Sequence, residues 1–454
     1  MVDVFGSQEK RREFVRSGRE HVLMITNHGV HQWKVVPGLP DTGGQNVFVN
    51  QFTAALAQRG FKITIVNRGG YMHPVTGERL EGFVYRDKHR RILYLEDDKS
   101  EFVRKEDMDE QIPRLVQSLA RSLDARVDLI ISHYWDGAKV GVLYNRTLPE
   151  RVKHVWVPHS LGAVKKRNVL PERWAGLRID ERIAVEQDLI AELDGIASTS
   201  SKIGQALDKD YGYSGKALFL PPCVDPERYY AREIQDEDGI WDFLSQCSGL
   251  SPEKVRRSKI VTEISRTDTT KRKDVLIRAF ALARQQVPDS FLVVSIDKSK
   301  KKLSSELDDL IHALDLQDHV AVVGSVWDML PALYAITDVY CTPSVMEGFG
   351  MSAQEAAATR VPVIASHLVP FVTEYLMGQD AEVLDFAPDR QPVKRGKGAV
   401  LVQADDVQGF AYALAMLLGD DELRRDMGEN AYRITVPYFT WGNRVAAFLA
   451  EALS

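Results

Sequence analysis

Residues 341–358 read CTPSVMEGFGMSAQEAAA, an apolar strand end followed by a glycine-flanked loop and the start of a helix. The expected strand ends at Ser344, and the expected helix begins near Met351. Such strand–loop–helix units build parallel sheets that carry helices on both faces. The amides of the loop and of the helix start can hold anionic oxygens. The stretch therefore predicts an α/β fold with a ligand site at a strand end.

The same alternation of expected strands and helices extends over the whole chain: short apolar runs rich in β-branched residues are followed by longer amphipathic stretches. The expected strands are HVLMITNHG, FKITIVNRG, DLIISHY and HVWVPHS, then KIVTEISR, SFLVVSI, VAVVG, VYCTPS, VPVIAS and AVLV. Apolar residues recur at helical spacing within residues 46–60, which predicts a helix with Gly60 as its C-cap. Two successive series of this kind predict two doubly wound parallel sheets, each buried on both faces.

The polar, acidic segment 228–258 has little strand signal and marks the expected break between domains. We expect residues 1–230 and 231–454 to form two Rossmann-like domains that face a central cleft. The last helix, about 436–454, would pack back on the N-terminal domain. Residues 384–397, rich in charge, read as a surface insertion. Ligands of open α/β sheets bind at the C-terminal edges of the strands, so the chemistry is expected there.

The composition excludes several classes of protein. The 454 residues are 44% hydrophobic and 27% charged, and the formal net charge of -6 argues against a nucleic-acid partner. The three cysteines are far apart, which fits a reducing cytosol better than a metal ribbon or a redox pair. We see no signal peptide and no apolar run of about 18 residues, so we expect a cytoplasmic protein without stable membrane insertion.

Two acids and two cations stand at the expected strand ends of the second half. Glu347 lies in the glycine-flanked loop and Glu355 in the helix that follows, where carboxylates can accept hydrogen bonds from sugar hydroxyls. Arg266 and Lys271 follow the strand KIVTEIS, and such cations suit a diphosphate. Taken alone, a basic strand end is more often a solvated turn, and either glutamate can be a solvated or helix-capping residue.

Two further motifs stand in the first half. The loop DTGGQ places Gly43 and Gly44 between a strand and a helix, where the backbone can approach a phosphate or sugar closely. Taken alone, a Gly-Gly pair is more often an ordinary tight turn. The stretch WVPHSLGAVKKRN ends a strand at His159 and continues to Lys165. His159 could instead be a core histidine with its hydrogen bonds satisfied.

In order and spacing, these motifs resemble glycosyltransferase family 4, retaining enzymes with the two-domain GT-B architecture. Glu347 and Glu355 match the E-x7-E signature of that family, and Arg266 and Lys271 match its Arg-x4-Lys diphosphate clamp. The resemblance runs from His28 to YFTWGNRVAAFL. The motifs DTGGQ, SHYWDGAKVG, VPHSLGAVKKRN and RIDERIAVE are most similar to the branch of sucrose-phosphate synthase and mannosylfructose-phosphate synthase.

The resemblance implies a role for each site residue. The N-terminal domain would bind the acceptor and the C-terminal domain the nucleotide sugar. His159, Arg266, Lys271 and Glu347 would be catalytic: His159 would contact the transferred sugar, and the two cations would neutralise the departing diphosphate. The donor-binding residues would be Gly43, Gly44, Gly348, Phe349, Gly350 and Glu355, the last on the ribose. The acceptor-binding residues would be Gln45, Lys105, Lys165 and Arg182, the three cations facing its phosphate. Lys105 and Arg182 could equally lie on solvated helix faces.

Three departures from the family pattern bear on the donor side and on the surface. The loop HLVPFVTE lacks the usual Gly-Gly pair, VVSIDKSKKKL lacks a glycine after its strand, and the insertion near 384–397 is long. The first two leave the nucleotide base and the transferred sugar open. The acceptor and the oligomeric state are open as well.

The sequence favours a retaining hexosyltransferase that moves a sugar, most simply from UDP-glucose, to a phosphorylated acceptor such as fructose 6-phosphate. No cluster of metal ligands is visible, so we expect that neither a metal nor another cofactor is required. Three alternatives are open: another small acceptor, a lipid acceptor at a membrane surface, and a nucleotide-sugar epimerase. The acids in EFVRKEDMDEQIPRLVQSLARSL weaken the membrane alternative.

Overall fold

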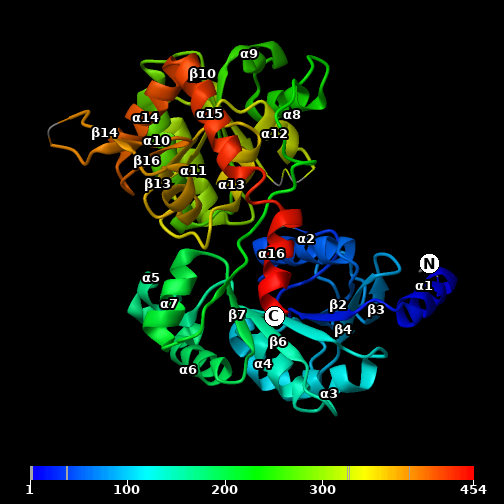
Figure 1. The fold of residues 1–454 in the computed structure, drawn as a ribbon. Helices are drawn as coiled ribbons and strands as arrows, with labels where there is room; N and C mark the ends of the chain where they lie inside the picture. Colours follow the sequence, from blue (N-terminus) through cyan, green and yellow to red (C-terminus); the bar gives the residue numbers. More distant parts are fainter. Residues whose placement is uncertain (1–3, 37–38, 325, 327, 388, 454) are drawn as a thin grey trace. The chain divides into compact units, whose positions relative to one another are not determined.

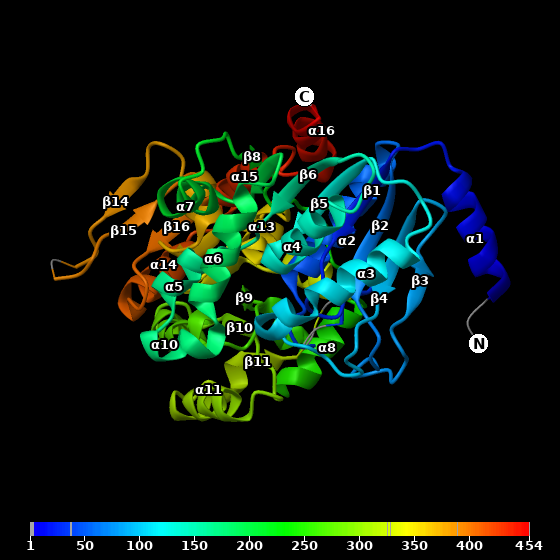
Figure 2. The ribbon, with the colours of Figure 1, turned by 90° about the horizontal axis from the view of Figure 1, so that it is seen from below.

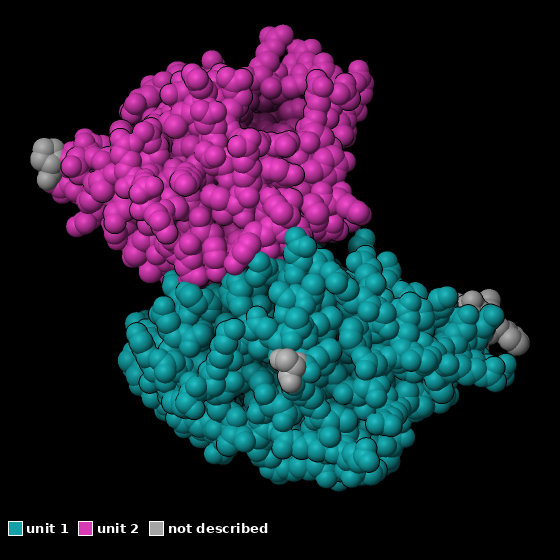
Figure 3. Space-filling model, viewed as in Figure 1, with its two compact units in different colours: residues 1–222, 441–454 teal, residues 223–440 magenta. Residues whose placement is uncertain are grey.

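The computed structural model describes residues 4–36, 39–324, 326, 328–387 and 389–453, and it divides the chain into two compact units (Figure 3). The first unit comprises residues 1–222 and 441–454, and the second comprises residues 223–440. The chain thus enters the second unit earlier than the expected boundary at 230/231. The reason is that Val224 already pairs with Thr440, and its amide donates to the carbonyl of Phe439 at 2.9 Å.

The first unit is built on an eight-stranded sheet with the order β3-β4-β2-β1-β5-β6-β7-β8. Its strands are β1 (His21–Ile25), β2 (Lys62–Arg68), β3 (Gly82–Tyr85), β4 (Arg90–Leu95), β5 (Leu129–His133), β6 (Lys153–Val157), β7 (Gly195–Ser198) and β8 (Leu218–Phe219). Only the β3–β4 pair is antiparallel among these neighbours. The central strands β1, β2 and β5 are buried along their whole length, as expected for a parallel sheet covered on both faces.

Helices cover both faces of this sheet. They are α1 (Val4–Arg16), α2 (Gly44–Gln58), α3 (Ile112–Ser122), α4 (Tyr134–Asn145), α5 (Gly162–Asn168), α6 (Ile179–Ile190), α7 (Ser201–Tyr211) and α16 (Trp441–Ala452), with 3-10 turns η1 (Lys105–Gln111), η2 (Pro171–Arg173) and η3 (Ala175–Leu177). Helices α2 and α16 lie on one face, and α3 and α4 lie on the other (Figures 1 and 2). The rings of Trp441 and Phe52 stack at 5.6 Å, so the last helix packs against α2.

The second unit has its own eight-stranded sheet, with the order β11-β10-β9-β12-β13-β16-β15-β14. Its strands are β9 (Lys259–Glu263), β10 (Ser290–Ser295), β11 (Val320–Val323), β12 (Val339–Thr342), β13 (Val363–Ser366), β14 (Glu382–Leu384), β15 (Val393–Arg395) and β16 (Ala399–Val402). The six strands predicted for this half are parallel neighbours. The predicted class, α/β with two Rossmann-like sheets, is confirmed.

The helices of the second unit pack on this sheet, and two of them lie in the segment that was expected to be a break between domains. They are α8 (Gly239–Ser248), α9 (Pro252–Arg257), α10 (Lys273–Arg284), α11 (Lys301–Ala313), α12 (Leu330–Ala335), α13 (Met351–Ala358), α14 (Val407–Gly419) and α15 (Asp421–Thr435), with the 3-10 turns η4 (Thr269–Lys271) and η5 (Gln317–His319) and the π-turn η6 (Val372–Leu376). Segment 228–258 is therefore not a plain break. It forms α8 and α9, whose N-caps Asp238 and Ser251 accept hydrogen bonds from the first-turn amides.

Three smaller expectations are refined by the structure. The insertion near 384–397 contributes strands, since β14 and β15 form an antiparallel hairpin that extends the sheet, and the ring of Phe386 stacks on Tyr412 at 5.0 Å. The C-cap of α2 is Arg59, and Gly60 follows it with a φ of 95°. No helix within the described part of the chain is long and apolar enough to cross a membrane.

Candidate functional site

Neighbouring strands bring the predicted residues of the second unit to one edge of its sheet. Strands β9 and β12 are parallel partners, so the loops that follow them lie side by side. The amide of Val345 donates to the carbonyl of Thr270 at 2.8 Å, which ties the two loops together. Lys271 forms an ion pair with Glu347 across them. We call the residues 266–271, 347–350 and 355 the second-unit site.

The two cations of this site differ in their surroundings. Lys271 is buried, with a side chain 8% exposed, and its ammonium group lies on the carboxylate of Glu347. Arg266 is exposed, and within the described residues no ion pair reaches it. The structure therefore places Arg266 on the loop of Lys271 but leaves its guanidinium group available to a ligand.

The glycine-flanked loop leads directly into α13. Gly350 is the N-cap with a φ of 114°, and a Cβ there would lie 2.7 Å from Cγ1 of Val369. Only glycine suits both the conformation and the space. Phe349 is buried, and its carbonyl accepts from the amide of Phe371 at 2.8 Å. The amides at the start of α13 can therefore receive an anionic oxygen.

Glu355 lies in the second turn of α13, beside two tyrosines that the sequence analysis missed. Tyr334 donates to Oε2 of Glu355 at 3.3 Å, and Tyr229 also hydrogen-bonds to this carboxylate. Burial raises the pKa of Glu355 to about 7, although both hydrogen bonds act in the opposite direction. Nothing in the local pattern of MLPALYAI distinguished Tyr334 from an apolar core residue.

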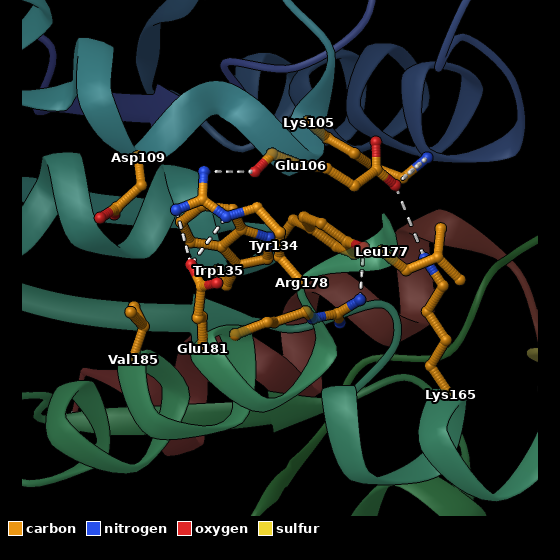
Figure 4. Close-up of a pocket in the computed structure, with 11 residues that line it drawn as sticks. Lys105, Glu106, Asp109, Tyr134, Trp135, Lys165, Leu177, Arg178, Glu181 and Val185 are labelled. Carbon is orange, nitrogen blue, oxygen red and sulfur yellow. Dashed lines mark hydrogen bonds and ion pairs between the residues drawn. The ribbon is translucent and has the colours of Figure 1, made fainter. Parts of the chain in front are cut away.

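The first unit holds a pocket that gathers the cations predicted for the acceptor (Figure 4). It has about 390 Å³ of empty space and lies among η1, α4, α5 and α6. We call it the basic pocket, and its lining residues are Lys105, Glu106, Asp109, Tyr134, Trp135, Lys165, Leu177, Arg178, Glu181, Arg182 and Val185. Lys105, Lys165 and Arg182 come from three separate elements, and the fold brings them to this one cavity.

Carboxylates hold the two lysines of the basic pocket. Lys105 forms an ion pair with Asp41, the first residue of the DTGGQ loop. The ammonium group of Lys165 lies 3.7 Å from Oε1 of Glu106. Burial, together with the nearby charges of Arg182 and Lys105, lowers the pKa of Lys165 to about 8. Lys165 is therefore the cation of this pocket whose charge depends on pH near neutrality.

Arg182 is a buried residue, which corrects the expectation of a solvated helix face. It is 5% exposed, and its Nε donates to Oε1 of Glu186, one turn along α6, at 2.7 Å. Its other nitrogens donate to Oη of Tyr134 at 2.5 Å and to the carbonyl of Ser160 at 2.6 Å. Glu186 is completely buried and also accepts from the amide of Gly162 at 2.8 Å. The guanidinium group is thus fixed in one orientation.

Sequence reasoning missed four charged residues of the basic pocket, which are Glu106, Asp109, Arg178 and Glu181. Arg178 stands at the start of α6 with a φ of 46°, and it pairs with Glu181 at 2.6 Å. Glu106 is the carboxylate that lies near both Lys165 and Lys105. The spacing of four residues between Arg178 and Arg182 was the available signal, since Arg178 is the N-cap of α6 and Arg182 lies one turn further along.

The remaining predicted residues of the first unit lie around the ends of β1 and β6. His159 follows β6 with a φ of 55°, and its ring is hydrogen-bonded to that of His133. Gln45 donates to Oγ1 of Thr26 at 3.0 Å. Gly43 precedes α2, with its amide bonded to Asn46 at 2.9 Å, and Gly44 is the first residue of that helix. Neither glycine nor Gln45 lines the basic pocket.

Among the residues that the structure describes, no group of three or more His, Cys, Asp and Glu side chains is arranged to hold a metal ion. Metal independence stays a prediction.

Both halves of the chain match models of known families. Residues 42–228 match the model described as Glycosyltransferase Family 4, and residues 251–434 match the model described as Glycosyl transferases group 1. The chain is 26% identical to the mannosylfructose-phosphate synthase of Agrobacterium fabrum over 362 residues, 76% of each protein. It is 28% identical to the D-inositol 3-phosphate glycosyltransferase of Salinispora arenicola over 459 residues, which cover 98% of this chain and 93% of that protein.

Solved structures share the fold. The sucrose-phosphate synthase from Thermosynechococcus elongatus aligns with a TM-score of 0.74 at 23% identity, over 96% of this chain and 98% of that one. Anabaena HepE in complex with UDP and glucose aligns with a TM-score of 0.67 at 17% identity, over 95% of this chain and 100% of that one. The two-sheet architecture is therefore that of GT-B proteins.

Proposed function

The chain belongs to the glycosyltransferases of group 1 and family 4, and we propose that it transfers a hexose from a nucleotide-diphosphate sugar to a small phosphorylated acceptor. UDP-glucose is the proposed donor, and fructose 6-phosphate is the proposed acceptor. The observation that carries this proposal is the basic pocket, where Lys105, Lys165 and Arg182 converge from separate elements. Ammonium and guanidinium groups held in place suit a phosphate dianion far better than an uncharged sugar.

The donor is proposed to bind the second unit. Arg266 and Lys271 would neutralise the diphosphate, with the amides of Phe349 and Gly350 beside them. Glu347 would hold sugar hydroxyls, and Glu355 would hold the ribose. The ion pair of Lys271 with Glu347 supports this assignment, since one group for a phosphate and one for a sugar then lie next to each other. Gly43 and Gly44 would lie against the donor's phosphate or sugar.

The proposed reaction retains the configuration of the sugar. The bond from the anomeric carbon to the diphosphate oxygen breaks, and its electron pair stays on that oxygen. The acceptor hydroxyl forms the new bond on the same face, and its proton passes to the departing phosphate oxygen. Arg266 and Lys271 would stabilise the growing negative charge, so the protein acts mainly by positioning and electrostatics. The carbonyl of His159 would face the reacting carbon.

A second class of acceptor deserves the same test. The D-inositol 3-phosphate glycosyltransferases to which the chain is similar carry a phosphorylated cyclitol in their name. The basic pocket could hold the phosphate of such an acceptor by the same groups. The proposal therefore commits to a phosphate on the acceptor, and the ring that carries the phosphate is decided by the screen of acceptors.

A donor-by-acceptor screen tests the proposal. UDP-, ADP- and GDP-sugars would be crossed with fructose 6-phosphate, inositol 3-phosphate, glycerol 3-phosphate, 3-phosphoglycerate and unphosphorylated fructose, and nucleotide release and product mass would be read. We expect products only with phosphorylated acceptors. Reaction with fructose alone would refute the assigned roles of Lys105, Lys165 and Arg182. Epimerised donor in the absence of acceptor would favour the epimerase alternative, and sedimentation with liposomes would favour a lipid acceptor.

A further inference from the structure

Two histidine rings meet at the ends of β5 and β6 in the first unit. His133 is the last residue of β5, and His159 follows β6, its parallel partner. Nδ1 of His133 lies 2.8 Å from Nε2 of His159, and the rings stack with centroids 5.1 Å apart. Since a hydrogen bond needs one proton between two ring nitrogens, one histidine must donate and the other must accept.

Both rings are neutral at ordinary pH. Burial lowers the pKa of His159 to about 3 and the pKa of His133 well below its usual value. The nearby His31 is also held neutral, because burial lowers its pKa to about 4. Each neutral imidazole carries one proton, so fixing that proton on one nitrogen of His133 fixes the tautomer of both rings.

The environment of His133 decides which nitrogen carries its proton. Its ring is completely buried, and Nε2 has no hydrogen-bond partner within the described residues. A buried N–H without a partner is rarer in proteins than a buried acceptor without one. The proton of His133 therefore belongs on Nδ1, from which it donates to His159. Nε2 of His159 must then accept, and the proton of His159 lies on its Nδ1.

The surrounding residues hold this arrangement in place. The ring of Phe48 meets the ring of His159 edge to face at 4.9 Å, and it also touches Trp441 of α16 at 5.0 Å. His159 has a φ of 55°, a conformation that costs free energy in a residue with a side chain. The hydrogen bond between His133 and His159 can offset part of this cost. No hydrogen bond to Nδ1 of His159 is present in the described part of the chain.

We propose that His133 is a positioning residue that locks His159 as its Nδ1–H tautomer, so that His159 presents an uncharged N–H donor to an oxygen of the transferred sugar. The catalytic part of this inference rests on the proposed function, whereas the tautomer does not. A neutral N–H can donate a hydrogen bond to a sugar oxygen without placing an unpaired positive charge in a buried position.

Two further histidines, His31 and His28, lie near this pair and provide an internal comparison. Nδ2 of Asn46 lies 3.1 Å from Nδ1 of His31, and Nε2 of His31 lies 3.1 Å from Oδ1 of Asn50. These partners fix His31 as the Nε2–H tautomer. In His28, Nδ1 lies 3.1 Å from Oδ1 of Asp136, a carboxylate oxygen that can only accept from it. The cluster is therefore expected to contain both tautomers side by side, each set by its neighbour.

Selective ¹⁵N-histidine labelling with NMR reads the tautomer directly. In the full chain without ligand, the spectrum should show His159 protonated on Nδ1 and His31 protonated on Nε2 at pH 7.5, with assignment from His159→Gln and His31→Gln variants. A His159 signal from the Nε2–H form, or from the charged form, would overturn the proposal. This readout does not depend on any activity.

Two substitutions test the consequence for catalysis. His133→Asn keeps an N–H near the position of Nδ1 and should preserve the His159 tautomer and most of kcat. His133→Leu removes the donor and should lower kcat by roughly 30-fold while the donor KM changes little, as expected when one positioned hydrogen bond is lost. His154→Leu is the matched control, since His154 is a buried residue of β6 whose ring is hydrogen-bonded to Ser132.

The outcomes separate the two claims. Equal losses of kcat in His133→Leu and His154→Leu, tracking their melting temperatures, would mean that His133 is only a core residue. If His133→Leu does not fold, the spectrum and the kcat of His133→Asn still decide the question. Loss of the His159 Nδ1–H signal in His133→Asn with unchanged kcat would show that the tautomer of His159 has no role in catalysis. If no donor and acceptor pair reacts, the proposed function fails while the tautomer result still holds.

Discussion

The two units use positive charge in opposite ways. In the basic pocket of the first unit, Arg182 is buried on Glu186 and Lys105 is paired with Asp41, so these cations are held before any ligand arrives. In the second-unit site, Lys271 has one carboxylate partner and Arg266 lies exposed. The cations of the basic pocket are thus held in place by carboxylates in advance, whereas the second-unit site keeps one cation exposed to solvent.

The two sites should differ most in how much their arginines contribute to the stability of the fold. Arg182→Met should lower the free energy of unfolding by about 3–5 kcal/mol, because it leaves Glu186 charged and buried without its partner. Arg266→Met should change it by less than about 0.5 kcal/mol, since that side chain is exposed. Urea denaturation of both variants measures this. Equal effects on stability would remove the distinction between the two sites.

A paired change sharpens the same comparison. Arg182→Met combined with Glu186→Leu should recover part of the lost stability, because the unpaired charge is gone. It should not recover acceptor binding, since the guanidinium group is absent. Recovery of the acceptor KM would show that Arg182 has only a structural role.

Lys271→Ala should have the largest effect on the reaction. We expect kcat/KM to fall roughly 100-fold or more, equivalent to a few kcal/mol, because the departing diphosphate would lose one of the two cations proposed to neutralise it. Steady-state kinetics measure the loss, and Lys298→Ala is the control, since Lys298 is an exposed lysine of the same unit paired with Asp308. A loss below about threefold would contradict the proposed role.

Lys165→Met should weaken the binding of the acceptor and leave the binding of the donor unchanged. The KM of a phosphorylated acceptor should rise about 10-fold, as expected for one lost charge-assisted hydrogen bond, with the donor KM unchanged. Lys166→Met is the neighbouring control, because Lys166 pairs with Asp180 and lies over the ring of Trp174. If both variants behave alike, the pocket does not bind the acceptor phosphate.

The smallest effect concerns pH and the ribose. Because burial raises the pKa of Glu355 to about 7, its carboxylate is largely protonated below that pH and ionised above it. An ionised carboxylate accepts ribose hydrogen bonds better, so nucleoside diphosphate affinity should increase several-fold from pH 6 to pH 8. Calorimetry on the wild type and on Glu355→Gln separates this effect from ionisation of the ligand. Parallel pH profiles in the two proteins would show that Glu355 is not responsible.

Local pattern was enough for the fold and for the second-unit site. Parallel strands end at the same edge, so the cations after β9 and the acid after β12 had to be neighbours. That rule places the loop of Lys271 beside the loop of Glu347. The helices α8 and α9 were missed because their segment is polar and acidic, although Asp238 and Ser251 are N-cap residues that could have been recognised.

Contacts between distant segments could not be predicted in the same way. Arg182 can be buried because Tyr134 and Ser160, which belong to other parts of the chain, accept hydrogen bonds from its guanidinium nitrogens. Tyr229 and Tyr334 reach Glu355 from outside its own motif. The pairing of His133 with His159 depends on the register of β5 with β6. Residue types and spacing identify the strand ends, but side-chain partners at those ends are set by tertiary packing.

A crystal structure of the protein with a bound nucleoside diphosphate tests the central claim most directly. The account predicts diphosphate oxygens within hydrogen-bonding distance, about 3 Å, of both the guanidinium group of Arg266 and the ammonium group of Lys271, beside the first turn of α13. A diphosphate bound at full occupancy away from these two cations would contradict it.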